Sequence, residues 1–445
     1  MSASQPDLAL RGTLLRFRGD PFEMPPDEAL DIETDGIVLI RDGHIVETGP
    51  FARLKDRLPP GTGLHDYSNC LIGPGFIDAH VHYPQFGVIA SYGEQLLSWL
   101  ERYVFPEERR FSDPGYATQI ASAFLDALLA NGTTTACVYC TVHPESVDAF
   151  FSESQRRNTR MIAGKVLMDR NAPDFLCDTA QSGYDQSRAL IERWHDRGRQ
   201  LYAVTPRFAP TSTREQLALA GALLDTSGTL FMQTHLLETT AEERWVRSLF
   251  PERRSYLDVY DHAGLVRPRS VFGHAVHIHD ADLHRCHDAG CAIAHCPTSN
   301  AFLGSGAFDL FEALRPDRRV HVALGSDIGG GNALSMLRGM NDAYCAAQSH
   351  DRRLHPVQAY WLATLGAARA LGLEASIGHL TPGIEADLCI LDPFCTPVLA
   401  QRSARAESVA DLLFALSMLG DDRAVRATYV MGVRQPRPRG WARET

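Results

Sequence analysis

The sequence predicts an α/β protein, a TIM-type (β/α)8 barrel accompanied by a small β-sandwich domain built from both ends of the chain. Three observations lead to this prediction. Between residues 74 and 377, short apolar strands alternate with amphipathic helical stretches, which is typical of parallel βα units. Both ends of the chain are instead rich in strand patterns. Polar side chains follow several of the barrel strands, where barrel enzymes place their active sites.

Length and composition fit a soluble globular protein and argue against two other classes, membrane-spanning proteins and nucleic-acid-binding proteins. The chain has 445 residues, 44% hydrophobic, 22% charged and 9% aromatic, enough for a barrel with an accessory domain. No apolar run approaches the roughly 18 residues of a membrane helix. The formal net charge of -11 gives no general attraction to nucleic acid. The first residues lack a secretory signal, so we expect a cytoplasmic protein with reduced cysteines.

Residues 1–73 have the pattern of β structure. Apolar runs lie at 8–17, 36–41 and 44–47. Asp42-Gly43 separates the last two runs, and this pair between apolar segments is a strong signal for a hairpin. We therefore expect the chain to begin with paired strands rather than with the barrel.

The end of the chain returns to strand character. After a predicted helix over 356–371, the segments 378–392 and 425–433 again read as strands. We expect residues 1–73 and 378–445 to meet in the small β domain, while residues 74–377 form the catalytic barrel. The sequence alone does not show that the two ends meet.

Eight candidate strands lie in the barrel region, the number that a TIM barrel requires. They are residues 76–82, 133–138, 161–167, 202–206, 230–235, 271–274, 292–295 and 321–327. Several intervening helices begin near Ser, Thr or Asp or end near Gly, as capped helices do. The predicted helices include 115–130, 186–197, 214–224, 241–249 and 280–289.

Four residues at predicted strand ends suggest a metal site. His80 and His82 are two positions apart, so on a strand both imidazoles share one face. His235 ends the fifth strand and Asp327 ends the eighth. Alone, His235 could bond a backbone carbonyl and Asp327 could be a turn residue. Together the four form a suitable ligand set for zinc or another first-row divalent ion, with one position left for water.

Two further residues have predicted catalytic roles. A bound ion would lower the pKa of its water toward ~7, and a proton carrier would then be needed. Glu238 lies three residues after His235 and could move that proton, although it could also be a surface residue opening a helix. His274 could hydrogen-bond the metal-bound water and orient it.

For several other candidate residues, we predict a structural or supporting role rather than a direct catalytic one. Lys165 could have been a carbamylated bridge between two metals, but it lies within a predicted strand, so one metal is simpler. His295 is expected behind the metal ligands. The single pair Cys137 and Cys140 is weak evidence for zinc and is read as structural. Residues 92–111 are expected near the site, where they could close over it.

The motifs around these residues resemble the amidohydrolase superfamily, specifically its aminohydrolase branch. The resemblance rests on Pro74 to His82, Thr234 to Glu238, Gly273-His274, His295-Cys296-Pro297 and Gly325-Ser326-Asp327. Within the branch, further motifs are similar to the guanine deaminase family. They are Tyr83-Pro84-Gln85, Leu97 to Leu100 through Tyr103, Phe105-Pro106-Glu107, Gly164 to Val166 with Met168-Asp169, and Pro206 to Thr211.

The resemblance implies a zinc-dependent barrel, commonly a homodimer, that converts guanine and water to xanthine and ammonia. His80, His82, His235 and Asp327 would hold the metal. The substrate contacts that the resemblance implies for the purine are Gln85, Arg207 and Phe208. An arginine donor, an amide and an aromatic ring suit the edge and face of a flat purine.

One departure and two alternatives stay open. Leu236-Leu237 stands where relatives often carry a smaller polar residue, which bears on the placement of Glu238. A deaminase of 8-oxoguanine, a pterin or a triazine is the nearest alternative. A non-catalytic barrel scaffold is the more distant one, and it predicts missing ligands.

Overall fold

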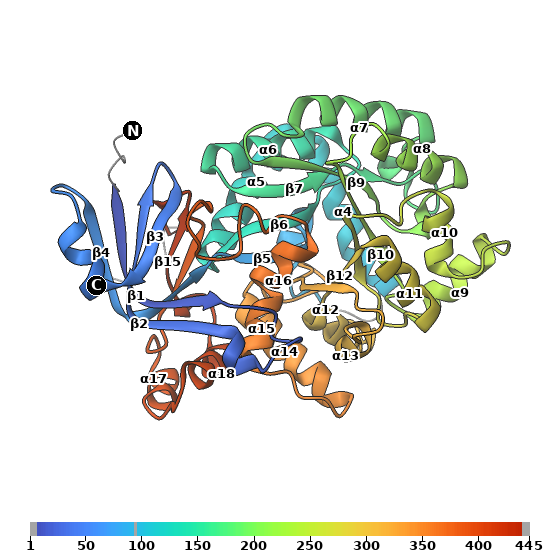
Figure 1. Cartoon of the computed structure of the whole chain (residues 1–445). Helices are drawn as coiled ribbons and strands as arrows, with labels where there is room; N and C mark the ends of the chain where they lie inside the picture. Colours follow the sequence, from blue (N-terminus) through green and yellow to red (C-terminus); the bar gives the residue numbers. More distant parts are fainter. Residues whose placement is uncertain (1–6, 93–95, 438–445) are drawn as a thin grey trace.

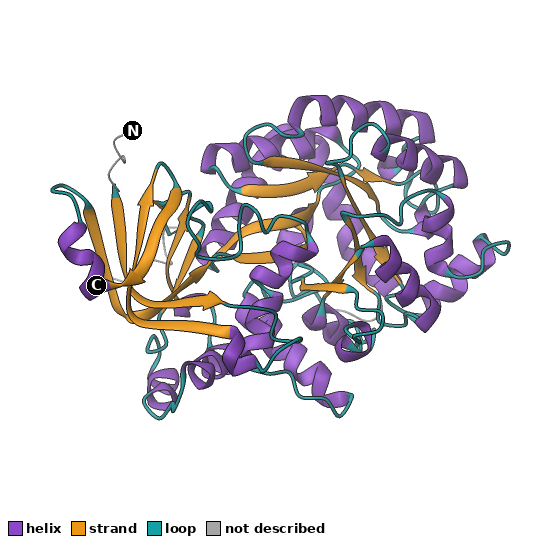
Figure 2. Ribbon diagram, in the orientation of Figure 1, coloured by secondary structure: helices purple, strands orange, loops and turns teal. Residues whose placement is uncertain are grey.

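The computed structural model describes residues 7–92 and 96–437. Figures 1 and 2 show two parts, a barrel of strands surrounded by helices and a smaller sheet to its left, where strands from both chain ends lie together. The predicted fold class is confirmed. Within the described residues, none of the helices combines the length and apolar character needed to cross a membrane.

The barrel strands follow one another in chain order and pair in parallel. The sequence of neighbours is β5-β6-β7-β9-β10-β11-β12-β13, with β8 paired to β9. Their bounds are β5 (Phe76–His82), β6 (Thr133–Tyr139), β7 (Arg160–Gly164), β8 (Val166–Leu167), β9 (Gln200–Pro206), β10 (Phe231–Leu236), β11 (Ser270–His274), β12 (Ala292–His295) and β13 (His321–Leu324). Most residues of these strands are buried, as expected for a sheet covered on both faces.

The barrel closes between its first strand and the segment after its last strand. The N–H of Asp327 donates to the carbonyl of His80 at 2.8 Å, and the N–H of His82 donates to the carbonyl of Ile328 at 3.0 Å. Asp78 accepts from the N–H of Ser326 at 2.9 Å across the same junction. This junction, which we call the seam, therefore places His80, His82 and Asp327 side by side.

Helices cover the outside of the barrel (Figure 2). Their bounds are α5 (Pro114–Ala130), α6 (Pro144–Arg157), α7 (Ala180–Trp194), α8 (Arg214–Leu224), α9 (Thr240–Leu249), α10 (Tyr256–His262), α11 (Asp280–Ala289), α12 (Pro297–Phe302), α13 (Leu310–Ala313), α14 (Met336–Ser349), α15 (Pro356–Leu362) and α16 (Leu365–Ala370). The predicted bounds of the helices at 214–224 and 280–289 agree with the structure. The predicted helix at 186–197 begins earlier, because Thr179 caps it through the N–H of Ser182.

The small domain is one mixed sheet that curls on itself. Its strand order is β16-β15-β14-β4-β1-β2-β3. The bounds are β1 (Leu8–Phe17), β2 (Leu30–Arg41), β3 (His44–Pro50), β4 (Gly63–Pro74), β14 (Leu388–Leu391), β15 (Val425–Val430) and β16 (Val433–Arg434). Val38 and Ile45 from the first strands share a core with Leu388 and Tyr429 from the last ones. The two chain ends thus form opposite layers around one core.

Short helices accompany this sheet. They are α1 (Pro26–Ala29) and α2 (Phe51–Leu54), and α17 (Pro397–Ser403) and α18 (Val409–Leu419) between β14 and β15. The rings of Tyr344 in α14 and Phe414 in α18 are 5.2 Å apart, so α18 packs against the barrel. The domain limits at 74 and 377 stay a prediction, and residues 1–6 and 438–445 of the predicted small domain lie outside the described residues.

Two predicted elements are interrupted. The strand at 161–167 is split at Lys165, whose backbone N–H donates to the Tyr202 hydroxyl at 3.3 Å instead of to a strand partner. The helix at 356–371 is split into α15 and α16 near Ala363, whose carbonyl accepts from the N–H of Ile77 at 2.9 Å. In both cases a tertiary contact takes a backbone group that the regular element would have used.

Buried ion pairs join the small domain to the barrel. Glu385, just before β14, accepts from Nε of Arg160 at 2.9 Å and from Nη2 of Arg199 at 2.6 Å. Arg199 also pairs with Asp387. Although burial opposes it, the hydrogen bond from Arg160 and the charge of Arg199 lower the pKa of Glu385. The ionised carboxylate therefore stabilises the contact between the domains.

Replacing Glu385 by glutamine should lower the free energy of unfolding by about 2 kcal/mol at neutral pH, the usual value of a hydrogen bond to a charged group. Because the folded-state pKa is lowered, this stabilisation is complete above the ordinary carboxyl pKa of about 4.3 and is lost as the pH falls through the folded value. Thermal unfolding at a series of pH values measures it. Glu215→Gln, at an exposed position of α8, is the control. An undiminished difference at about pH 3 would contradict this assignment.

Candidate metal centre and active site

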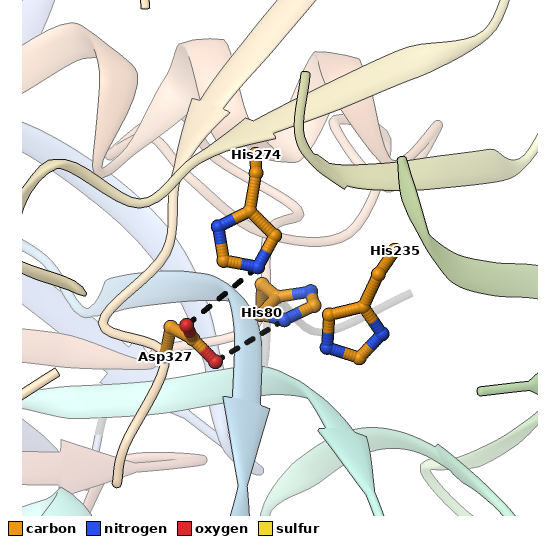
Figure 3. Close-up of side chains that lie close together, drawn as sticks. All are labelled: His80, His235, His274 and Asp327. Atoms are coloured by element: carbon orange, nitrogen blue, oxygen red, sulfur yellow. Dashed lines mark ion pairs between the residues drawn. The ribbon is translucent and has the colours of Figure 1, made fainter. Parts of the chain in front are cut away.

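The four predicted metal ligands meet at the C-terminal end of the barrel strands. His80 and His82 project from one face of β5, because residues two apart on a strand share a face. His235 is the penultimate residue of β10, and Asp327 follows β13. Figure 3 shows the side chains of His80, His235 and Asp327 turned toward one another, with His274 beside them.

Their polar atoms converge on one point. Nε2 of His80 lies 3.3 Å from Oδ1 of Asp327, and Nε2 of His82 lies 3.4 Å from the same oxygen. Nε2 of His82 is also 3.1 Å from Nε2 of His235. One ligand atom each from His80, His235, His274 and Asp327 lies within 4.8 Å of the others. Five residues therefore surround this point: His80, His82, His235, His274 and Asp327. A tetrahedral site made of protein ligands alone uses four, so one of the five need not be a ligand.

The protonation of three imidazoles suits a metal ion. Nδ1 of His235 lies 2.6 Å from the carbonyl oxygen of Arg207, which can only accept, so Nδ1 carries the proton and Nε2 the lone pair. Burial lowers the pKa of His80 and lowers those of His82 and His235 well below the ordinary value. A neutral imidazole offers a lone pair to a metal ion, so these residues fit a divalent metal.

The carboxylate of the cluster is ionised. Although burial opposes it, the hydrogen bond with His80 and the positive charge available on His274 lower the pKa of Asp327. An ionised oxygen beside three neutral nitrogens is the donor set that zinc takes in hydrolytic sites.

His274 differs from the other imidazoles. Its Nδ1 is 2.9 Å from Oδ1 of Asn300, and its Nε2 is 3.6 Å from both Glu238 Oε2 and Asp327 Oδ2. Although burial lowers it, the charges of Glu238 and Asp327 raise the pKa of His274 above its ordinary value. A ring that takes up a proton more readily is a poorer metal ligand, so these directions favour His82 over His274 as the fourth ligand.

Glu238 faces the same point. Burial raises the pKa of its carboxyl to about 7, and Ser305 Oγ donates to Oε1 at 2.9 Å. The backbone conformation of Leu237 accounts for the position of Glu238. Leu237 has a left-handed φ of 50°, which turns the chain after β10. Leu236 and Leu237 are buried in the core. The apolar pair at this position therefore packs behind Glu238 without displacing it from the site.

A cavity extends from the metal centre. Its wall carries the predicted substrate contacts Gln85, Arg207 and Phe208, together with residues from the short helices α3 (Leu96–Trp99) and η3 (Leu100–Val104). The remaining lining residues include His82, His235, Glu238, Glu242, His274, Leu303, Asp327 and Gly330. The structure thus gathers all the predicted catalytic, substrate-binding and metal-binding residues at one place.

The remaining candidate residues with a predicted structural or supporting role lie outside the lining of the cavity. Lys165 is buried in an ion pair with Asp178 and is absent from the lining of the cavity. His295 is buried behind the cluster, 5.2 Å from the ring of Phe308. Cys137 Sγ donates to Gln233 at 3.0 Å. Closure of the 92–111 segment stays a prediction, and residues 93–95 lie outside the described part.

Sequence reasoning missed three residues that support the site. Asn300 orients His274, and Ser305 bonds Glu238. Glu108, at the end of α4 (Phe105–Glu108), bonds Arg207 and Gln85. Asn300 follows the His295-Cys296-Pro297 motif closely enough for that motif to have pointed to it. Glu108 directly follows the Phe105-Pro106-Glu107 motif, so that motif could have pointed to it in the same way.

A parallel barrel with three imidazoles and a carboxylate at its strand ends, and a second carboxylate beside them, defines the class of metal-dependent barrel hydrolases. The model of the amidohydrolase family matches residues 71–434. The chain belongs to the amidohydrolase family.

The similar proteins narrow the comparison to one group within this family, the guanine deaminases. Guanine deaminase of Escherichia coli (strain K12) is 46% identical over 435 residues, 97% of this chain and 98% of the relative. A solved structure of the E. coli guanine deaminase has a TM-score of 0.93 at 45% identity, covering 96% of this chain and 99% of that one. The guanine deaminase of C. acetobutylicum, solved with bound guanine, has a TM-score of 0.84 at 26% identity, covering 96% and 99%. The predicted resemblance to guanine deaminases is confirmed.

Proposed function

We propose that the chain catalyses the hydrolytic deamination of guanine to xanthine and ammonia. The observation that carries the proposal is one cavity in which a buried glutamate faces a cluster of metal-ligand type and a buried arginine and glutamine form the wall. The relatives named above, which are guanine deaminases, support the choice of substrate.

The metal would be held by His80, His82, His235 and Asp327, and we propose one zinc ion, or another first-row divalent ion. Such an ion makes water a nucleophile at neutral pH by lowering its pKa toward ~7. The directions of the four pKa shifts support this ligand set, because each side chain presents a lone pair.

The chain's own residues would move the proton. Net reaction breaks the bond between C2 of guanine and its exocyclic nitrogen and forms a bond from C2 to the oxygen of water. Glu238, with a pKa of about 7, accepts one proton from water and delivers it to the departing nitrogen, which leaves as ammonia. The second proton of water ends on N3 of xanthine, and Asp327 shares in these transfers. His274, held by Asn300 and facing Glu238 and Asp327, keeps the two carboxylates in place and donates toward the reacting oxygen.

Arg207, Gln85 and Phe208 would bind the purine. The N–H groups of Arg207 face the carbonyl oxygen, the amide of Gln85 bonds the ring edge, and Phe208 packs beside the ring. Homodimer assembly and a place in purine catabolism stay predictions of the resemblance, and a cytoplasmic location stays a prediction of the sequence analysis.

Ultraviolet detection of the conversion of guanine to xanthine, with a parallel metal count on the same protein, tests the proposal. Ammonia release from 8-oxoguanine, a pterin and a triazine should be measured beside it. A clearly higher kcat/KM on one of these compounds would replace guanine as the substrate. Substoichiometric metal together with no turnover would favour the scaffold alternative.

Replacing Arg207 by alanine should lower kcat/KM for guanine by about 100-fold, because a charge-assisted hydrogen bond to the carbonyl oxygen is lost. The metal content should not change, since Arg207 contacts His235 only through its backbone carbonyl. Steady-state kinetics and metal analysis measure the two effects. Arg214→Ala, which removes a surface arginine paired with Glu252, is the matched control. An unchanged kcat/KM in Arg207→Ala would exclude this residue from purine binding.

A further inference from the structure

Glu108 is a buried carboxylate behind the wall of the cavity. It is 1% exposed and stands at the end of α4, three residues after Phe105. Its two oxygens each lie 2.9 Å from Nη1 of Arg207, and the guanidinium carbon of Arg207 lies 5.7 Å from the centroid of the Phe105 ring. One turn of helix therefore supplies both a charge partner and an aromatic face for Arg207. Breaking a buried pair of this kind leaves an uncompensated charge.

The same carboxylate fixes the amide of Gln85. Nε2 of Gln85 donates to Oε1 of Glu108 at 3.4 Å, while Oε1 of Gln85 accepts from the N–H of Gly329 at 3.1 Å. A carboxylate only accepts and a backbone N–H only donates, so the opposite orientation of the amide would lose both bonds. The amide nitrogen keeps its second N–H for another partner.

Arg207 is held in a comparable way. Glu108 engages Nη1, which leaves the N–H groups of Nη2 and Nε. Arg207 and Gln85 line the cavity that contains Glu238 and Asp327, whereas Glu108 does not line it. The carboxylate thus acts on the cavity through the two side chains in front of it.

We propose that Glu108 is a positioning residue that sets specificity for a purine with a carbonyl oxygen at C6, by holding Arg207 and Gln85 as N–H donors. The inference rests on the proposed function. O6 and N7 of guanine are hydrogen-bond acceptors, whereas the 6-amino group of an adenine-like ring is a donor. The N–H donors that the buried carboxylate holds in the cavity wall can pair with the acceptor edge of guanine. With an adenine-like ring, the same N–H donors would face another donor or stay unpaired, which disfavours its binding.

The test compares two substrates that carry the same reacting 2-amino group. Guanine has the C6 oxygen, and 2-aminopurine lacks it. Glu108→Gln should lower kcat/KM for guanine by about 10- to 100-fold, the effect of misplacing a charge-assisted hydrogen bond, with the larger part in KM. Guanine and 2-aminopurine share the ring nitrogens that Gln85 could contact. A change in kcat/KM that acts through those nitrogens is therefore expected for both substrates and cancels in their ratio. The ratio of kcat/KM for guanine over 2-aminopurine should therefore fall by about tenfold.

Glu107→Gln is the matched control, since Glu107 is the neighbouring residue and bonds Arg110 and Tyr116 instead. It should leave the ratio unchanged. Where turnover of 2-aminopurine is below detection, its inhibition constant against guanine gives the same comparison. If Glu108→Gln does not fold, Glu108→Asp, which withdraws the carboxylate by one methylene, is measured in its place with the same expectation.

The outcomes separate the two proposals. Wild-type protein that does not deaminate guanine overturns the proposed function. Wild-type protein that does so, with a Glu108 variant that contains metal and keeps the substrate ratio, overturns the role of Glu108. A fall of equal size for both substrates also overturns it, because a general structural role would not distinguish them.

Discussion

Replacing Glu238 by glutamine should reduce kcat for guanine by about 10²- to 10⁴-fold while the metal content stays that of the wild type. The amide keeps the size of the side chain and can still contact Ser305, but it cannot take up and release a proton at neutral pH. Glu238 faces His274 and is not one of the four proposed ligands, so we expect no ligand to be lost. Xanthine formation and metal analysis on one preparation measure both quantities.

Glu243→Gln is the control for this substitution. Glu243 lies at the start of α9 and bonds Arg247 at the surface, five positions after Glu238. The control should retain wild-type turnover. Near-normal kcat in Glu238→Gln would remove Glu238 from the proton path, and loss of metal from that variant would make it a ligand instead.

Replacing His82 by alanine should release most of the metal and abolish turnover, whereas replacing His274 by alanine should leave the metal bound and reduce turnover. The two rings are about equally buried and lie beside the same aspartate. They differ in how readily they take up a proton, because the pKa of His82 is lowered well below its ordinary value and that of His274 is raised. Only a neutral ring offers a lone pair to a metal. Metal analysis after gel filtration compares the two variants.

His295→Ala is the control for loss of a buried imidazole in general, since His295 lies outside the cavity lining. Its metal content should match that of the wild type. Retention of metal by His82→Ala with loss from His274→Ala would reverse the ligand assignment.

The strands and the first metal ligands could be predicted because their signals are local. His80 and His82 reveal a shared face through their spacing alone, and short apolar runs mark all the barrel strands. The hairpin at Asp42-Gly43 follows from two residues that accept a left-handed backbone, with φ of 50° and 77°. Such features depend on a few neighbouring residues.

What could not be predicted depends on contacts between distant segments. The break near Ala363 exists because β5 uses its carbonyl, and nothing within residues 356–371 reveals that demand. Glu108 contacts the cavity wall through Gln85 and Arg207, which are 23 and 99 positions away. Whether His82 or His274 is the better metal ligand depends on which carboxylates surround each ring. The sequence does not show where those carboxylates lie in space.

The seam of the barrel has a consequence for how the site comes into being. The ligands of β5 and Asp327 come from opposite ends of the barrel sequence, and Asp78 and Ser326, bonded across the seam, are 248 positions apart. A nascent or truncated chain that has not yet formed its last barrel strand therefore lacks part of the metal centre. The proposed ligand set is complete only once the last barrel strand has joined the first, so we expect full metal affinity only in the completed barrel.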